Sequence, residues 1–240
     1  MGGPLLARWH TDWDCGYETN WWYVIKDTPF DLSKLKSKRR YEINKGRRNF
    51  AVREINPSEC SEALYKITAE SYKTYPVAYR PSISHDAFVE EVAEWNFYKT
   101  YGAFSVENGE MCGYAILRRN GNYVDFRNLK SMPDMERLGV NAAIIYEMLT
   151  AHEDFLRSGG YVCDGSRNIL HETKFQDYLE KYFEFRKAYC KLRILYRPWV
   201  KAVLETAYPF RAMLQKADGF PLIHKLNGLL KMEEIRRTFQ

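Results

Sequence analysis

The order of elements predicted between Asn122 and Tyr196 constrains the fold of this 240-residue chain more than any other feature. A strand that includes Val-Asp-Phe-Arg-Asn is followed by a long amphipathic helix, a short strand at 160–165, a second helix and an aromatic-rich strand. A helical crossover of this length ordinarily joins parallel strands, so the strands at 122–131 and 160–165 are expected to be parallel neighbours. The segment therefore predicts a mixed sheet flanked by helices.

Two Asn-Gly dipeptides, Asn108-Gly109 and Asn120-Gly121, lie between apolar runs just upstream. This dipeptide favours the positive φ angles of tight hairpins, so it predicts three antiparallel strands at roughly 102–107, 110–118 and 122–131. The fold class is therefore α+β, with a mixed but mainly antiparallel sheet.

The chain divides along its length into three expected parts. A strand and a basic helix are expected at 1–56, the main domain at 57–197 and a helical segment at 198–240. With 45% hydrophobic residues the chain can bury a sizeable core. It contains no run of eighteen apolar residues and no secretory signal, so a cytoplasmic location is expected.

Several classes of site have no support in the sequence. The five cysteines include no closely spaced pair, which argues against a thiolate zinc site or a disulfide framework. The nucleophile elbow, the phosphate-binding Gly-Lys-Ser/Thr loop, the paired zinc histidines and the dinucleotide fingerprint are also missing from the sequence. No metal is expected.

Positive charge is concentrated between Ser33 and Arg48. This stretch holds eight basic residues and one acidic residue, a local charge of +7 in a chain whose total is +5. A helix capped by Asp31 or Ser33 would place five of its residues on one ridge: Lys34, Lys38, Tyr41, Lys45 and Arg48. The ridge is either a solvated helix face or a surface for a polyanion such as a nucleotide diphosphate, tRNA or an anionic lipid headgroup.

Three stretches carry a resemblance to a known family: Leu35 to Gly46 before a strand, Gly160-Tyr-Val-Cys-Asp-Gly165, and Lys174 to Pro198. They resemble the Fem-type branch of the GNAT superfamily, the FemAB-like or peptidoglycan-bridge acyltransferases, over about residues 22 to 200. The resemblance implies a GNAT-like sheet. It also implies transfer of an acyl or aminoacyl group from an activated carrier to an amine of a cell-envelope glycan, polysaccharide precursor, peptide or related small acceptor.

The resemblance also suggests a donor. Acyl-CoA-dependent members have a Gln/Arg-x-x-Gly-x-Gly/Ala loop at a helix N-terminus that receives the pyrophosphate. Its nearest counterpart here is one residue shorter, and its candidate donor-binding residues are Arg137, Gly139 and Asn141. In Fem proteins a helical arm is associated with tRNA, and this sequence contains no heptad segment that could form such an arm. Acyl-CoA is therefore favoured over aminoacyl-tRNA, and nucleic acid is a partner only if tRNA is the donor.

Such chemistry needs a base for the attacking amine and donors for the oxyanion. The candidates are Asp164 and Asp125, as base or amine-orienting groups, and His171 at the start of the following helix. Alternation places Asp125 with Arg127 on one face of their strand, and Val124, Phe126 and Asn128 on the other. The substrate-binding candidates are Arg127, Arg167, Lys38, Tyr41 and Lys45. Asp164 could instead cap a helix, and Asp125 could simply pair with Arg127.

Two other functions remain open from the sequence. The basic helix and Trp21-Trp22-Tyr23 could bind RNA or single-stranded nucleic acid without catalysis. The segments 199–204 and 221–231 could lay an apolar face on an anionic membrane, which would make the protein membrane-peripheral.

Overall fold

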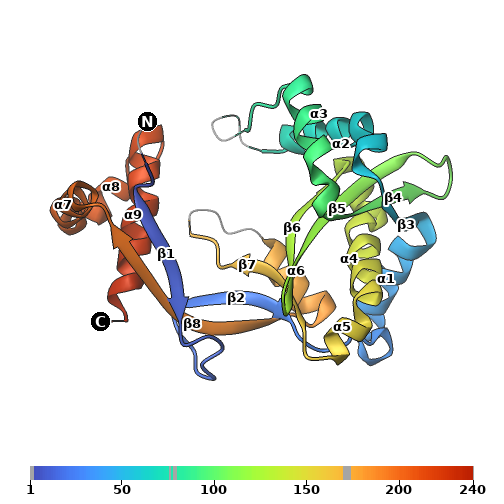
Figure 1. Cartoon of the computed structure of the whole chain (residues 1–240), viewed down its shortest axis with the longest axis horizontal. Helices are drawn as coiled ribbons and strands as arrows, with labels where there is room; N and C mark the ends of the chain where they lie inside the picture. Colours follow the sequence, from blue (N-terminus) through green and yellow to red (C-terminus); the bar gives the residue numbers. More distant parts are fainter. Residues whose placement is uncertain (1–2, 76, 78–79, 170–173, 240) are drawn as a thin grey trace. The chain divides into compact units, whose positions relative to one another are not determined.

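The computed structural model describes residues 3–75, 77, 80–169 and 174–239 and separates into two compact units (Figure 1). The first, called the core unit here, comprises Ile25–Gly165 and Tyr178–Phe185. The second, called the flanking unit, comprises Met1–Val24, Ser166–Asp177 and Arg186–Gln240.

The core unit is organised around five neighbouring strands in the order β7-β6-β5-β4-β3. Their bounds are β3 (Phe50–Ile55), β4 (Lys99–Ser105), β5 (Met111–Asn120), β6 (Tyr123–Ser131) and β7 (Tyr161–Ser166). β3 to β6 are antiparallel, and β7 is parallel to β6. Gly109 and Gly121, with φ angles of 74° and 59°, occupy the two predicted hairpin turns. The predicted mixed, mainly antiparallel sheet flanked by helices is confirmed.

Helices cover both faces of these strands (Figure 1). On one face lie η2 (Pro57–Cys60), α2 (Ser61–Lys73), α3 (His85–Ala93) and η4 (Glu94–Phe97). Their buried side chains form one cluster with the sheet: Leu64, Ile67, Phe88, Val92, Trp95, Tyr114 and Ile116. On the other face α4 (Val140–Ala151) crosses β3 to β6, and α1 (Ser37–Asn49) packs on α4. The side chains on the two faces therefore meet different helices.

The long helix predicted between the strands at 122–131 and 160–165 is wrong in its continuity. It consists of η5 (Pro133–Leu138), α4 and α5 (Glu153–Arg157). Gly139, at φ 90°, separates η5 from α4, because a left-handed residue cannot continue a helix. His152 ends α4, and its Nδ1 lies 2.8 Å from the carbonyl oxygen of Met148.

The basic helix begins later than its sequence predicts. Asp31 caps the short η1 (Leu32–Lys34) instead, accepting a hydrogen bond of 2.9 Å from the backbone N–H of Ser33. Leu35 and Lys36 are extended, so α1 begins at Ser37. Lys34 therefore does not share the ridge with Lys38, Tyr41, Lys45 and Arg48.

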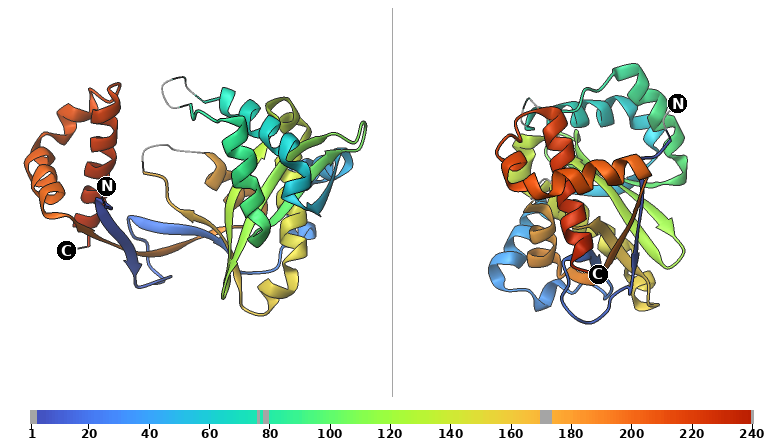
Figure 2. Two further views of the ribbon diagram at one scale, coloured as in Figure 1. Left: turned by 45° about the horizontal axis from the view of Figure 1, so that its top comes forward. Right: turned by 90° about the vertical axis from the view of Figure 1, so that its left-hand side faces the viewer.

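The flanking unit contains β1 (Leu6–Thr11) antiparallel to β8 (Arg186–Tyr196), with β2 (Trp21–Lys26) on the other side of β8. Its C-terminal helices are α7 (Pro198–Ala207), η6 (Tyr208–Phe210), α8 (Arg211–Gln215) and α9 (Pro221–Arg237), shown in red in Figure 2. Val200, Leu204 and Leu230 form their buried core. One further helix, α6 (Lys174–Phe183), precedes β8. No helix in the described ranges has both the length and the apolar character needed to span a bilayer.

Candidate functional site

β6 and β7 separate after only three paired positions. The pairs are Tyr123 with Tyr161, Val124 with Val162 and Asp125 with Cys163. Immediately beyond them β6 contains a β-bulge: Ile116 and Leu117, adjacent on β5, pair with Asn128 and Phe126, so Arg127 is the extra residue. A bulge bends its strand and increases the local twist. The two parallel strands therefore diverge where the bulge begins.

The divergence exposes a row of backbone groups on β6. From Phe126 to Ser131 the strand stays paired with β5 on one side, and the structure records no pairing with β7 among the described residues. Backbone N–H groups on such an edge are fixed donors that a ligand oxygen can accept. The gap thus holds preorganised donors for developing negative charge.

Asp125 lies at the point where the strands part. Its side chain is half-buried and shares a face with Cys163, its neighbour on the parallel strand. Burial raises the pKa of the Asp125 carboxyl above its usual value, and the charges of Arg127 and Arg118 offset only part of this rise. Burial also raises the pKa of the Cys163 thiol to about 12, so this thiol is neutral at physiological pH. A raised pKa makes the ionised carboxylate a stronger base for proton transfer.

The bulge changes the face on which Asn128 lies. The sequence pattern groups Asn128 with Phe126, but Asn128 pairs with Ile116 and Phe126 with Leu117, so the two β6 residues face opposite sides. Asn128 therefore shares the face of Asp125, on the side of α2 and α3. It lines a cavity of about 260 Å³ with side chains that include Tyr72, Trp95 and Tyr114.

Asp164 follows Cys163 directly, so alternation turns its side chain to the face opposite Asp125. The charges of both carboxylates act on the pKa of Cys163, which places both near the start of the gap. Gly165, at φ 106°, then turns the chain through a conformation that other residues rarely adopt. The structure brings the two aspartates to one end of the divergence but not to one face.

The N-terminus of α4 has the features of an anion-binding site. The structure shows no side-chain cap there, so the N–H groups of its first turn are available. Lys45 of α1 donates from Nζ to the carbonyl oxygen of Arg137 at 2.6 Å, and Asn49 Nδ2 donates to Leu138 O at 3.0 Å. Asn141 Oδ1 is buried and has no hydrogen-bond partner in the described part of the chain. The structure thus brings Lys45 to the junction of η5 and α4, which contains Arg137, Gly139 and Asn141 and is called the loop below.

Two glycines allow α1 and this loop to approach so closely. A Cβ added at Gly46 would lie 2.3 Å from Gly139 O, and one added at Gly139 would lie 2.9 Å from Gly46 Cα. Sequence reasoning did not single out Gly46 or Asn49, although a glycine in the middle of a helix usually has a packing reason. Gly46 was therefore the sequence feature that could have indicated a close helix contact at this position.

Three other predicted residues lie elsewhere. Lys38 and Tyr41 are exposed on α1, and the guanidinium of Arg48 lies 5.7 Å from the Tyr41 ring. Arg167 belongs to the flanking unit, where it donates to the carbonyl oxygen of Asn20 at 2.8 Å and stacks 4.3 Å from the ring of Trp22. The other arginine predicted to bind substrate, Arg127, belongs to the core unit. It is exposed, and its guanidinium lies 5.3 Å from the centre of the Tyr98 ring.

His171 lies outside the described residues. Among those described, no group of His, Cys, Asp and Glu side chains could hold a metal ion.

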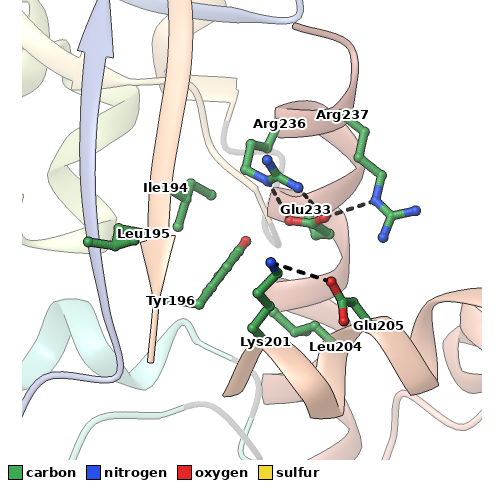
Figure 3. Close-up of a pocket in the computed structure, with 9 residues that line it drawn as sticks. All are labelled: Ile194, Leu195, Tyr196, Lys201, Leu204, Glu205, Glu233, Arg236 and Arg237. Carbon is green, nitrogen blue, oxygen red and sulfur yellow. Dashed lines mark hydrogen bonds and ion pairs between the residues drawn. The ribbon is translucent and has the colours of Figure 1, made fainter. Parts of the chain in front are cut away.

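A second cavity, of about 330 Å³, lies in the flanking unit between β8, α7 and α9 (Figure 3). The buried carboxylate of Glu233 accepts hydrogen bonds from Arg236 at 2.7 Å and from Arg237 at 2.8 Å. Burial alone would raise the pKa of Glu233, but the hydrogen bonds from both arginines outweigh it and hold the pKa below its usual value. The charged groups here satisfy one another, which indicates a structural role.

Replacement of Glu233 by alanine is expected to destabilise the protein by about 2–3 kcal/mol, because it leaves two partly buried guanidinium groups without their counter-ion. The lowered pKa means that this stabilisation is fully present above the usual glutamate range and is lost as the pH falls through the folded-state pKa. Urea unfolding at neutral and acidic pH measures both effects. Glu234→Ala, beside it on α9 and more exposed, is the control; equal losses for both variants would contradict the assignment.

Comparison with family models and with curated proteins finds no match. Several solved structures are similar to this chain, including the following three. L-PGS from Bacillus licheniformis is 12% identical, with 80% of this chain and 62% of that chain covered at a TM-score of 0.48. FemX is 10% identical, with 70% and 59% covered at 0.49. A conserved protein of unknown function from Bacteroides thetaiotaomicron is 14% identical, with 78% and 63% covered at 0.50.

The chain therefore spans about three fifths of the length of these structures. At sequence identities of 10–14%, a structural similarity bears on the fold and not on the activity. The Bacteroides thetaiotaomicron protein, at a TM-score of 0.50, shares its fold with this chain, and its function is unknown.

Proposed function

We propose that this protein is an acyltransferase that moves an acyl or aminoacyl group from an activated carrier to an amine. The observation that carries the proposal is the divergence of β6 from β7 at the Arg127 bulge, directly beside the half-buried Asp125. An open strand edge supplies donors for an oxyanion, and a carboxylate of raised pKa supplies a base. Acyl transfer needs both at one carbonyl.

In the proposed reaction each group has one role. Asp125 takes a proton from the attacking amine while its nitrogen forms a bond to the donor carbonyl. The N–H groups of the β6 edge stabilise the oxyanion, the bond from the carbonyl carbon to the carrier's sulfur or oxygen then breaks, and the leaving group recovers the proton. Asp164, on the opposite face, orients the donor or the amine through its charge. The neutral Cys163 thiol is not the nucleophile in this scheme.

Acyl-CoA is the donor that fits the α4 terminus best. The first-turn N–H groups, Lys45 and the exposed Arg137 provide positive potential for a pyrophosphate, and the buried Asn141 Oδ1 needs a donor from a ligand. Six residues of β6, from Phe126 to Ser131, separate Asp125 from the end of the strand, a rise of about 20 Å. A carrier with its anionic group and reactive carbonyl at opposite ends of a long arm suits this separation.

The acceptor belongs in the cavity on the α2 and α3 side. Aromatic side chains of Tyr72 and Trp95 line it, together with the amide of Asn128 and the carboxylate of Glu91. Flat apolar surfaces beside an amide and a carboxylate suit a small molecule, a glycan or a peptide that carries an amine. A cell-envelope precursor is the acceptor class we propose.

Thermal unfolding with candidate carriers tests the donor assignment. We expect one of acetyl-CoA, longer acyl-CoAs, uncharged tRNA and charged tRNA to raise Tm. At one hundred times its Kd the gain is about 2.7 kcal/mol, or roughly 5–10 °C for a chain of this size. Lys45→Ala should reduce the shift, and Lys38→Ala, on the exposed end of the same helix, should not.

Two outcomes would contradict the proposal. One is the absence of a shift with every carrier. The other is a shift with RNA of any sequence that falls steeply with salt, without acyl transfer, which would favour the nucleic-acid-binding alternative.

A further inference from the structure

α7 has two apolar faces, and the protein covers only one of them. Val200 and Leu204 point into the buried core of the C-terminal helices, where they meet Leu230. Trp199 and Val203, one helical turn apart on another side of α7, are 57% and 49% exposed. The core does not need this second face, so its apolar character calls for another explanation.

The second face continues across the neighbouring helices. Val203 of α7, Phe210 at the end of η6, Met213 of α8 and Leu226 of α9 line an open and almost wholly apolar groove of about 550 Å³. Phe210 and Met213 are 56% and 63% exposed. The result is one apolar surface built from α7, η6, α8 and α9, called the α7–α9 face here.

Large apolar side chains extend this face at its rim. Phe220 and Leu222, at the start of α9, are 66% and 81% exposed, and Leu222 lies one turn before Leu226. Three aromatic side chains of this segment are therefore exposed: Trp199, Phe210 and Phe220. A pocket for a small ligand would enclose such groups, whereas a membrane interface accepts protruding aromatic and aliphatic side chains.

The charge of the segment fits an anionic surface. From Arg197 to Met232 it contains six basic and two acidic residues. Lys216 and Lys225 are exposed beside the groove, and Lys225 directly precedes Leu226 on α9. Of the two acidic residues, Asp218 is occupied by hydrogen bonds with His224 and Asn227 at 2.8 and 2.7 Å.

We propose that the α7–α9 face docks on an anionic lipid bilayer. The exposed apolar side chains enter the interfacial region, and Lys216 and Lys225 lie against acidic headgroups. This inference does not depend on acyl transfer, and it would hold for a protein with any activity in the core unit. It adds a membrane surface as the partner of the flanking unit.

Vesicle flotation with the full chain tests the proposal. We expect the protein to float with vesicles of phosphatidylcholine containing 30% phosphatidylglycerol, to bind pure phosphatidylcholine much more weakly, and to lose binding as salt is raised. Phe210→Ser combined with Met213→Ser should reduce binding at least tenfold, because both side chains are exposed in the unbound protein and would be buried in lipid. Lys225→Gln should reduce it about fivefold.

Matched controls separate docking from general changes in surface character. Phe97→Ser removes an aromatic side chain that is 89% exposed in the core unit, and Lys66→Gln removes an exposed lysine of α2. Neither control should change flotation. Far-ultraviolet circular dichroism confirms that the double variant is folded, since the Val200, Leu204 and Leu230 cluster is untouched.

Three results would overturn the proposal. The first is the absence of flotation with anionic vesicles. The second is equal binding of the double variant and the parent chain. The third is a concentration-dependent dimer, seen by light scattering, that the double variant abolishes; this would assign the face to a second copy of the chain.

Discussion

Replacement of Asp125 by asparagine is expected to lower kcat for acyl transfer by about 10²–10⁴-fold, the range for loss of a positioned general base. The substitution keeps the shape of the side chain beside the divergence of β6 and β7 but removes its ability to accept a proton. The rise in Tm caused by the donor should persist, because the site proposed for the donor's anionic group lies at the α4 terminus, beyond the end of β6 and separate from Asp125. Steady-state kinetics and thermal unfolding measure the two effects separately.

The pH profile adds a signature that a purely structural role would not produce. Activity of the parent chain should fall as the pH drops through the raised pKa of Asp125, whereas residual activity of the variant should lack this limb. The stability effect has the opposite sense. Because the fold holds this proton more tightly than the unfolded chain does, ionised Asp125 destabilises the fold at neutral pH, and stability increases as the pH falls through the raised pKa toward the usual aspartate range. Asp125→Asn should therefore be at least as stable as the parent at neutral pH.

Asp164→Asn is the companion variant, since this residue lies at the same end of the gap on the other face. We expect a smaller loss of kcat and an unchanged Tm. A full loss with Asp164→Asn and full activity with Asp125→Asn would transfer the role of base to Asp164. Full activity in both variants would remove the divergence site from the reaction.

Replacement of Gly46 by alanine is expected to destabilise the protein by about 2–3 kcal/mol and to abolish the donor-induced shift in Tm. In an open helix this change would stabilise by about 1 kcal/mol, because alanine is the better helix former. Here the new Cβ would lie 2.3 Å from Gly139 O and 3.1 Å from the backbone nitrogen of Ala143. Backbone atoms cannot move aside as a flexible side chain can, so α1 must move away from the loop.

The loss of donor binding follows from the same displacement. If α1 moves, Lys45 and Asn49 lose their hydrogen bonds to the loop carbonyl groups. Urea unfolding and carrier-dependent thermal shifts provide the two measurements. Asn44→Ala, two positions before Gly46 on the same helix, is the control for helix propensity. A Gly46→Ala protein as stable as this control, with the donor shift intact, would disprove the close crossing of α1 and the loop.

The parts of the fold that were predictable have strong local signals. The Asn-Gly dipeptides identified both hairpins because few other sequences accept positive φ there. The strand expected after Leu35–Gly46 is β3 (Phe50–Ile55), where Phe50, Val52 and Ile55 are residue types that favour strands. The parallel pairing of β6 with β7 followed from the length of the crossover between them.

The parts that were missed depend on tertiary structure. Nothing in the residues around Arg127 marks a bulge, since the extra residue is neither glycine nor proline and the register is set by pairing with β5. β1 was not predicted because it buries no residue and so shows no apolar alternation. The role of Gly46 depends on Gly139, ninety-three positions later, and no local pattern connects the two.

The same limits apply to the candidate site. Sequence reasoning selected Asp125, Asp164 and the loop at Arg137 from their places at strand and helix ends, and the structure locates them at the divergence and the α4 terminus. It could not select Asn128, because the expected alternation turned that residue to the wrong face until the bulge was known. The alternation of side chains along a strand predicts their faces only where no bulge intervenes, and the Arg127 bulge lies inside the candidate site.

The position of the unpaired β6 edge also bears on how the protein avoids self-association. An unpaired edge at the rim of a sheet can recruit a strand from another molecule and so promote aggregation. Here the unpaired stretch faces β7, and the pairs from Tyr123 to Asp125 close the wedge at one end. A foreign strand cannot lie along a closed wedge at the spacing that a ladder needs. The main-chain donors of β6 can therefore bind a small ligand but cannot pair with a strand of another molecule.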